Sequence, residues 1–298
     1  LPISDGISND MPPLEALALY YEYRSYTPPG NTGDEMMERL ADRLASVDLL
    51  DQAATLLDHQ MKFQAEKEKR SRIGTKLATI YLLNKQPKKA LTALEDSVYG
   101  ENPLLLRLYR NRLTAQAMTD LNQSDKALLT LGQDNSNEAE AIRLDVYWKE
   151  KDWDKVAASA EGILKLRKDI TAPVTLQESK ALLRLALAYV FKGDMHQLHY
   201  LHDYFGPLMK DNPDKPVFDF ITSSDVPLTT RNFNEVIQQL SNTRSFIENY
   251  KARIDTAGLS PTLTTASAAA LPGAPSKPSP KTESKPEAAD ENKPGPKP

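Results

Sequence analysis

Three of the four histidines of the chain, His196, His199 and His202, lie in the stretch GDMHQLHYLHDYF, each three residues from the next. Closely spaced histidines can ligate a metal ion and would then indicate metal-dependent chemistry. On a helix, however, successive three-residue steps spread three side chains across ~120° of surface and ~9 Å along the axis. All three therefore cannot reach one tetrahedral zinc ion at ~2.0 to 2.1 Å.

One adjacent pair could hold an ion with help from Asp203 or a distant carboxylate, but the HExxH pattern of helical zinc sites is absent. We therefore expect structural or surface histidines on a helix and predict no functional metal. The alternatives are adventitious metal binding and a pH-sensitive packing role, since histidine titrates near neutrality.

The other residues form no catalytic constellation. The chain contains no cysteine, which excludes disulfides, thiol catalysis and thiolate metal sites and fits an oxidising compartment. It contains no GxSxG, P-loop or glycine-rich dinucleotide motif. Its acidic residues lie in charged helical stretches such as GDEMMER and QAEKEKR, where we expect them to face solvent. The sequence thus predicts a protein that is not an enzyme and needs no cofactor.

The composition is that of an ordinary folded protein. Of 298 residues, 40% are hydrophobic and 26% are charged, and the net charge is −4. This balance gives no sign of a nucleic-acid partner, and no apolar run approaches the ~20 residues that span a bilayer. The opening LPISDGISND lacks the basic and apolar parts of a signal peptide. Because the first residue is Leu, we expect a processed protein or a fragment, and a targeting segment could have preceded it.

Apolar residues recur with helical spacing over most of the chain. MERLADRLASV places Leu40, Leu44 and Val47 on one stripe, and similar stripes follow between polar breaks such as NKQP, NQSD and KGD. No stretch alternates convincingly with a period of two, so we predict an all-α fold. Nine of the 21 prolines lie from position 261 onward. Since such a composition buries too little apolar surface to order, we expect a disordered Pro/Ala/Lys-rich tail that serves as a linker or spacer.

Small residues recur at matched places in successive helix pairs. On the second helices, Ala53, Ala90 and Ala127 follow at intervals of 37 residues, and Val156 and Leu198 continue the series. On each first helix, a small residue or Leu is followed three positions later by a bulky residue. These pairs are Ala41 and Leu44, Ala78 and Tyr81, Ala115 and Met118, Leu144 and Tyr147, and Ala186 and Tyr189. Small side chains let two helices approach to ~8 to 10 Å, and bulky ones fill the neighbouring space.

This pattern resembles the tetratricopeptide repeat family, whose unit is a helix–turn–helix of about 34 residues. The stretch KLATIYLLNKQPKKALTAL matches best, through Leu77, Ala78, Tyr81, Ala90 and Leu94. The resemblance implies an α-solenoid of about five degenerate helix pairs with flanking capping helices and a disordered C-terminal tail.

The resulting division has five parts. They are a flexible segment at 1–12, a flanking helix at 13–33, the solenoid at 34–210, a linker and capping helix at 211–256, and the tail at 257–298. Dimerisation is the alternative role for the helix within 211–256.

The family's groove positions carry over to nine residues of this chain. They are Arg72, Lys76 and Thr79, then Tyr109, Arg112 and Gln116, then Lys180, Arg184 and Leu187. Five of the nine are cationic in a chain of net charge −4, which implies a groove for an extended peptide or helix that carries carboxylates, with Tyr109 as an apolar anchor. Scattered solvated charges are the alternative, and Glu138 and Asp145 dilute the positive seam. The asparagines of the family's carboxylate clamps are missing, so a chaperone C-terminal tail is not the expected ligand.

We therefore expect a non-catalytic interaction scaffold or adaptor that binds a partner peptide or helix in its concave groove, with no nucleic acid and no membrane insertion. The alternative is a regulatory C-terminal domain of a larger envelope protein whose activity lies in a missing N-terminal part. The stretch GDEMMERLADRLASVDLLDQAATLL also resembles the C-terminal part of long bacterial repeat-containing envelope proteins of unassigned function. That resemblance implies a periplasmic or cell-envelope location, with the cytoplasm as the alternative.

Overall fold

The computed structural model describes residues 11–28, 30–64, 67–98, 100–165, 167 and 169–222, and this part of the chain contains helices and turns but no strand. The prediction of an all-α fold is confirmed. The helices are α2 (Pro13–Tyr23), α3 (Asn31–Ser46), α4 (Leu50–His59), α5 (Lys67–Leu83), α6 (Pro87–Asp96), α7 (Leu104–Asp120), α8 (Ser124–Leu131), α9 (Asn137–Glu150), α10 (Trp153–Lys165), α11 (Leu176–Lys192), α12 (Met195–Phe205) and α13 (Lys215–Thr222). Short irregular turns of helix lie at η1 (Arg24–Tyr26), η2 (Gln60–Gln64) and η3 (Pro207–Met209).

The boundaries differ from the predicted ones near both ends. The predicted flanking helix at 13–33 is α2 followed by η1, and α3 already begins at Asn31. At the other end, α13 lies in the region predicted as a linker. The predicted capping helix beyond Thr222, the tail at 257–298 and most of the segment 1–12 lie outside the described residues.

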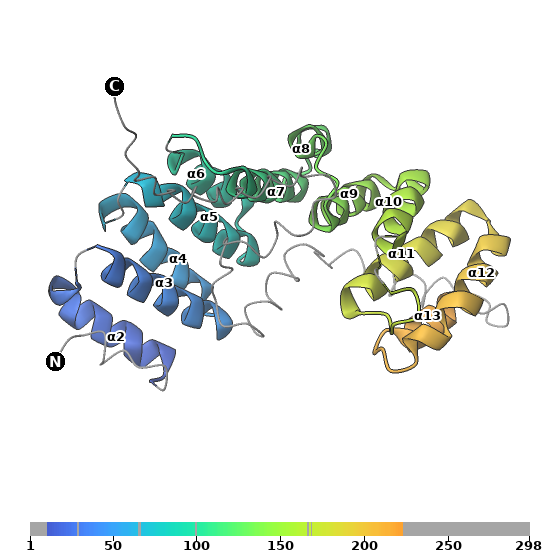
Figure 1. Ribbon diagram of the computed structural model, residues 1–298, viewed down its shortest axis with the longest axis horizontal. Helices are drawn as coiled ribbons and strands as arrows, with labels where there is room; N and C mark the ends of the chain where they lie inside the picture. Colours follow the sequence, from blue (N-terminus) through green and yellow to red (C-terminus); the bar gives the residue numbers. More distant parts are fainter. Residues whose placement is uncertain are drawn as a thin grey trace, which may run out of the picture. The chain divides into compact units, whose positions relative to one another are not determined.

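Helices that follow one another in the sequence pack side by side (Figure 1). They form the pairs α3–α4, α5–α6, α7–α8, α9–α10 and α11–α12, and α2 packs on the first pair while α13 packs on the last. The first helices also meet across pairs, since α5 contacts α7, α7 contacts α9 and α9 contacts α11. Each pair is therefore held by its neighbours as well as by its own turn, which is the packing expected of helical repeats.

The five turns that join the two helices of each pair have the same backbone structure. One residue in each adopts a positive φ between 55° and 70°, namely Asp48, Lys85, Asn122, Lys151 and Gly193. Its N–H bonds the carbonyl three residues earlier at 3.1 to 3.2 Å, and the next N–H bonds the carbonyl five residues earlier at 2.8 to 3.0 Å. These two bonds define the Schellman motif that ends a helix. The carbonyls five residues back belong to Leu44, Tyr81, Met118, Tyr147 and Tyr189, the bulky residues of the sequence repeat.

The small residues of the repeat lie where neighbouring helices touch. Ala41, Ala78, Ala115 and Ala186 on the first helices, and Ala53, Ala90 and Ala127 on the second, are all 0% exposed. The larger residues that replace alanine in the weaker repeats, Leu144, Val156 and Leu198, are also buried. The repeat register predicted from the sequence is thus the register of the five observed helix pairs.

The buried residues form two hydrophobic clusters that meet on α9. Ile142 and Val146 belong to the cluster of α2 to α9, whereas Leu144 and Trp148 belong to the cluster of α9 to α13. The side chain of Tyr147 packs against both. The two clusters are therefore joined by one helix, α9, which contributes side chains to both.

Candidate functional site

His202 joins α12 to α13. Its Nδ1 lies 2.7 Å from Oγ1 of Thr222, and its ring stacks on Phe218 with 6.1 Å between ring centroids. Because the Thr222 hydroxyl donates its single proton to the Phe218 carbonyl at 2.8 Å, Nδ1 is the donor to Oγ1. His196 and His199 lie on the exposed side of α12. In the part of the chain that the structure describes, no three His, Asp or Glu side chains are placed to share a metal ion.

Four of the nine predicted groove residues are buried. Thr79 and Leu187 are 0% exposed, and Gln116 and Arg184 are 1% exposed. The Thr79 hydroxyl donates to the carbonyl of Thr75 at 3.0 Å, and Gln116 donates its amide N–H to Asp120 at 3.2 Å. In this structure these four side chains pack inside the molecule, so they offer no surface to a ligand.

The cations of α5 are paired with carboxylates of α3. Arg72 bonds Glu38 at 2.7 Å, and Nζ of Lys76 lies 2.5 Å from Oδ2 of Asp42. The two residues of each pair are 34 positions apart, so an acid in one helix pair meets a base at the matching place in the next. These charges link the first helices of the first two helix pairs.

The other predicted cations also have partners within the chain. Arg112 on α7 bonds Asp134 at 2.7 Å and lies 3.9 Å from Glu138. Arg184 on α11 bonds Asp145 on α9 at 2.5 Å. Glu138 and Asp145 therefore act as the internal counter-charges of the seam that they were predicted to dilute.

The other five predicted groove residues keep some exposure to solvent, although Lys76 and Arg112 keep only 9% and 15% of their side-chain surface. The Arg72 side chain is 49% exposed, and Tyr109 and Lys180 are partly buried. Burial lowers the pKa of Lys180, and the nearby Asp214 opposes the shift. Burial therefore disfavours the charged form of Lys180, and a carboxylate of a ligand placed nearby would stabilise that form.

Several buried acids were expected to face solvent. Asp34, in the stretch GDEMMER, is 4% exposed and pairs with Lys69 at 2.9 Å, so that expectation is wrong for this residue. Asp42 is 1% exposed, and burial raises its pKa to about 7 although Lys76 acts in the opposite direction. The signal that could have found these acids is their position one repeat length before a base.

Arg110 was not predicted as a special residue, yet it joins three helices. It is 7% exposed, and its guanidinium donates to the Ser71 carbonyl, to the hydroxyls of Thr75 and Ser97, and to the Leu94 carbonyl. All four of these acceptors are uncharged, and burial lowers the pKa of Arg110. The residue therefore satisfies backbone and hydroxyl groups at the junction of α5, α6 and α7.

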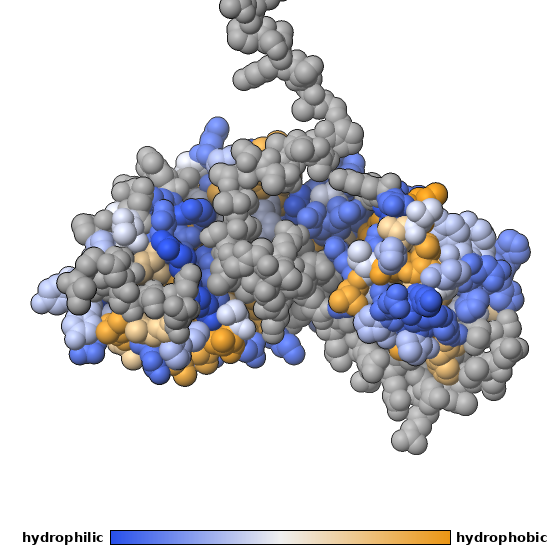
Figure 2. All heavy atoms as spheres, turned by 60° about the horizontal axis from the view of Figure 1, so that its bottom comes forward, coloured by the Kyte–Doolittle hydropathy of each residue, from blue (hydrophilic) through white to orange (hydrophobic). Residues whose placement is uncertain are grey.

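No known protein family, curated protein or solved structure matches this chain. Among the described helices, none combines the length and the apolar character needed to cross a bilayer. The described surface shown in Figure 2 has hydrophilic and hydrophobic residues interspersed. Most of the predicted groove cations thus form ion pairs within the chain. Arg72 and Lys180 keep enough exposure to contact a carboxylate of a ligand.

Proposed function

We propose that this chain is a non-catalytic protein-interaction scaffold, a tetratricopeptide-like α-solenoid that binds a peptide or helix of a partner protein. The observation that supports the proposal is the identical Schellman turn in all five helix pairs, together with packing of each pair on the next. Helical repeats of this kind present extended surfaces whose residues can vary without disturbing the core. In this chain, the buried small residues at matched positions belong to that core.

We propose further that the partner segment is acidic and contacts Arg72 and Lys180. The Arg72 side chain is half exposed and forms an ion pair with the carboxylate of Glu38. A carboxylate of the ligand can compete for this guanidinium. Lys180 is a partly desolvated cation whose charged form gains from a nearby carboxylate. Arg112 and Arg184 are poor test positions because their side chains are only 15% and 1% exposed, so their loss would also disturb the packing of the helices.

A comparison of two double variants tests this function. Partners are captured with the full chain as bait, identified by mass spectrometry and then measured with purified proteins. R72A/K180A should weaken binding and lower its dependence on salt, because two contacts with carboxylates of the partner are lost. The matched control is R39A/K165A, since both side chains are exposed and each pairs with an acid of its own helix. Equal binding by the two variants would contradict the assignment.

We propose the bacterial envelope as the location of the chain, in line with its lack of cysteine and with the resemblance of its sequence to repeat-containing envelope proteins. Fractionation of cells that express the full open reading frame tests this. Recovery with a cytoplasmic marker alone would overturn it.

A further inference from the structure

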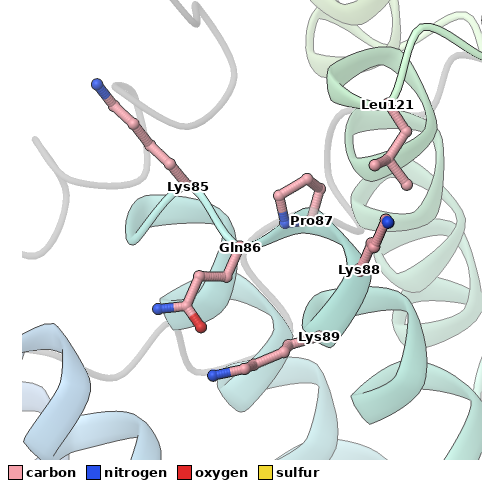
Figure 3. A pocket seen from close by; sticks show the side chains of 6 residues that line it. All are labelled: Lys85, Gln86, Pro87, Lys88, Lys89 and Leu121. Carbon is pink, nitrogen blue, oxygen red and sulfur yellow. The ribbon is translucent and has the colours of Figure 1, made fainter.

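A pocket of about 380 Å³ lies where the α5–α6 turn meets the end of α7 (Figure 3). It is lined by Lys85, Gln86, Pro87, Lys88, Lys89 and Leu121. Lys88 and Leu121 point toward each other, and the ring of Pro87 lies near them (Figure 3). The lining thus combines three lysines with the apolar side chains of Pro87 and Leu121. The ammonium of Lys88 lies on the side of Leu121, whereas the side chains of Lys85 and Lys89 extend away from it toward the surface (Figure 3).

The positive charge of this pocket is not matched by an acid in its wall. All three lysines are exposed, and the six lining residues include no carboxylate. Asp51 of α4 lies beside the pocket, and its Oδ1 accepts hydrogen bonds from Asn84 at 2.7 Å and Gln86 at 3.3 Å. This carboxylate oxygen is thereby engaged by two amides rather than by the lysines.

The equivalent turns of two other helix pairs are different because acids accompany their lysines. In the α9–α10 turn, Lys155 pairs with Asp152 at 2.7 Å. In the α11–α12 turn, Lys192 pairs with Asp154 at 2.7 Å, and Asp194 caps α12. Because the backbone of the α5–α6 turn is the same, its side chains alone distinguish it from these two.

Two features restrain the lysines of the pocket. The ammonium of Lys89 lies 5.6 Å from the centroid of the Tyr81 ring, within the range of a cation–π contact. Lys85 is the residue with positive φ in the turn, and its backbone is fixed by the Schellman hydrogen bonds. The first turn of α6 contains no acidic residue, so the helix dipole adds to the attraction for carboxylates.

We propose that this lysine pocket docks an acidic peptide segment of a partner protein. Its carboxylates pair with Lys85, Lys88 and Lys89, and an apolar side chain between them packs on Pro87 and Leu121. The inference rests on the proposed scaffold function, and it adds a contact at a helix turn to the one at Arg72 and Lys180. The apolar side chains beside these lysines favour a peptide over a simple inorganic anion.

The test uses the full chain and a fluorescein-labelled peptide with glutamates on both sides of one leucine. Binding is followed by fluorescence anisotropy at low and at physiological ionic strength. The pocket variant is K85N/K88Q/K89Q, in which Asn is chosen because it tolerates positive φ. The matched control, K126Q/K165Q/K210Q, loses the same charge from exposed positions elsewhere. Circular dichroism and thermal unfolding show whether both variants fold. If the triple pocket variant does not fold, the single variants K88Q and K89Q replace it.

We expect the pocket variant to bind the peptide roughly 3- to 100-fold more weakly than the wild type, with a smaller salt dependence, and the control to change little. Equal weakening in both variants would overturn the pocket while leaving the scaffold function intact. The pocket proposal is also overturned if inorganic phosphate displaces the peptide and the leucine contributes nothing, because the site would then be a simple anion site. If the wild type binds no acidic peptide, the pocket proposal fails. The scaffold function is tested separately, by capture of partners with the wild-type chain and comparison with R72A/K180A.

Discussion

Asp145 on α9 and Arg184 on α11 form an ion pair inside the molecule, with 2.5 Å between Oδ1 and the guanidinium nitrogen and side-chain exposures of 7% and 1%. The guanidinium also lies over the Trp148 ring, 5.6 Å from its centroid. Burial raises the pKa of Asp145, and Arg184 opposes that shift. Two buried charges stabilise a structure only as a pair, so this contact ties α11 to a defined position on α9.

Arg184→Met should lower the free energy of unfolding by ~3 to 5 kcal/mol, because it leaves the Asp145 carboxylate buried without its charged partner. The double variant D145N/R184M should recover part of that loss, since neither charge is then buried. Urea unfolding followed by circular dichroism measures both.

Arg39→Met is the control for this experiment. Arg39 pairs with Glu35 on the surface, with both side chains more than half exposed, so the change should cost less than about 1 kcal/mol. If R184M and R39M unfold at the same urea concentration, the buried pair does not hold the two helices together.

The helix pairs could be predicted from the sequence because small residues and turns obey local rules. Alanine at a helix contact is required by the distance between helices, and its recurrence is visible in a single chain. The polar breaks NKQP, NQSD and KGD each contain the residue that adopts positive φ, namely Lys85, Asn122 and Gly193. The amino-acid sequence alone is therefore enough to predict the register of the repeat.

The roles of the charged residues could not be predicted in the same way. A lysine such as Lys76 has the same appearance in the sequence whether it faces solvent or pairs with an acid of another helix. The partner becomes evident only when the repeat length is known, because Asp42 lies 34 residues earlier. The groove prediction treats the cations as free for a ligand, whereas the structure places most of them in internal pairs.

The pH dependence of stability should report the buried Asp42. Burial raises its pKa from 3.8 to about 7, so the folded protein binds a proton that the unfolded chain releases. The contribution of the Asp42 carboxyl to the free energy of unfolding is therefore complete below about pH 4 and is lost as the pH rises toward about 7. We expect the free energy of unfolding of the wild type, relative to D42N, to fall by about 1 to 4 kcal/mol over that interval.

Urea unfolding at several pH values, from about pH 4.5 to about pH 8, measures this difference. Glu35→Gln is the matched control, because Glu35 is largely exposed and its replacement should leave a curve parallel to that of the wild type. A D42N curve that is also parallel would show that Asp42 does not titrate in this range.

Substitutions at the turn position with positive φ should have opposite effects in different helix pairs. Gly193→Ala should destabilise the protein by ~1 to 2 kcal/mol, since a Cβ is strained in the left-handed region although nothing lies within 4 Å of it. Asn122→Gly, at the same place in the α7–α8 turn with φ 58°, should be neutral or stabilise by up to about 1 kcal/mol. Thermal unfolding of both variants checks this, and a loss of stability in both would mean that the two turns are not equivalent.

A close contact between α5 and the C-terminal end of α6 depends on a glycine. A Cβ built on Gly74 would lie 2.1 Å from Cβ and Oγ of Ser97 and 3.0 Å from the Ala93 carbonyl oxygen. Ser97 is itself 0% exposed and accepts a hydrogen bond from Arg110 at 3.1 Å, so it cannot move without disturbing the junction of α5, α6 and α7. Gly74→Ala should therefore cost ~1 to 3 kcal/mol or more.

Gly162→Ala provides the opposite case within the same fold. Gly162 lies inside α10, and a Cβ there would meet no atom within 4 Å. The substitution should thus stabilise the protein by ~0.5 to 1 kcal/mol through helix propensity alone. Urea unfolding of G74A and G162A separates steric contact from propensity, because both changes add the same methyl group to a helix. If G74A were as stable as G162A, the close approach of α5 and α6 at Ser97 would be wrong, and with it the packing that positions Arg110.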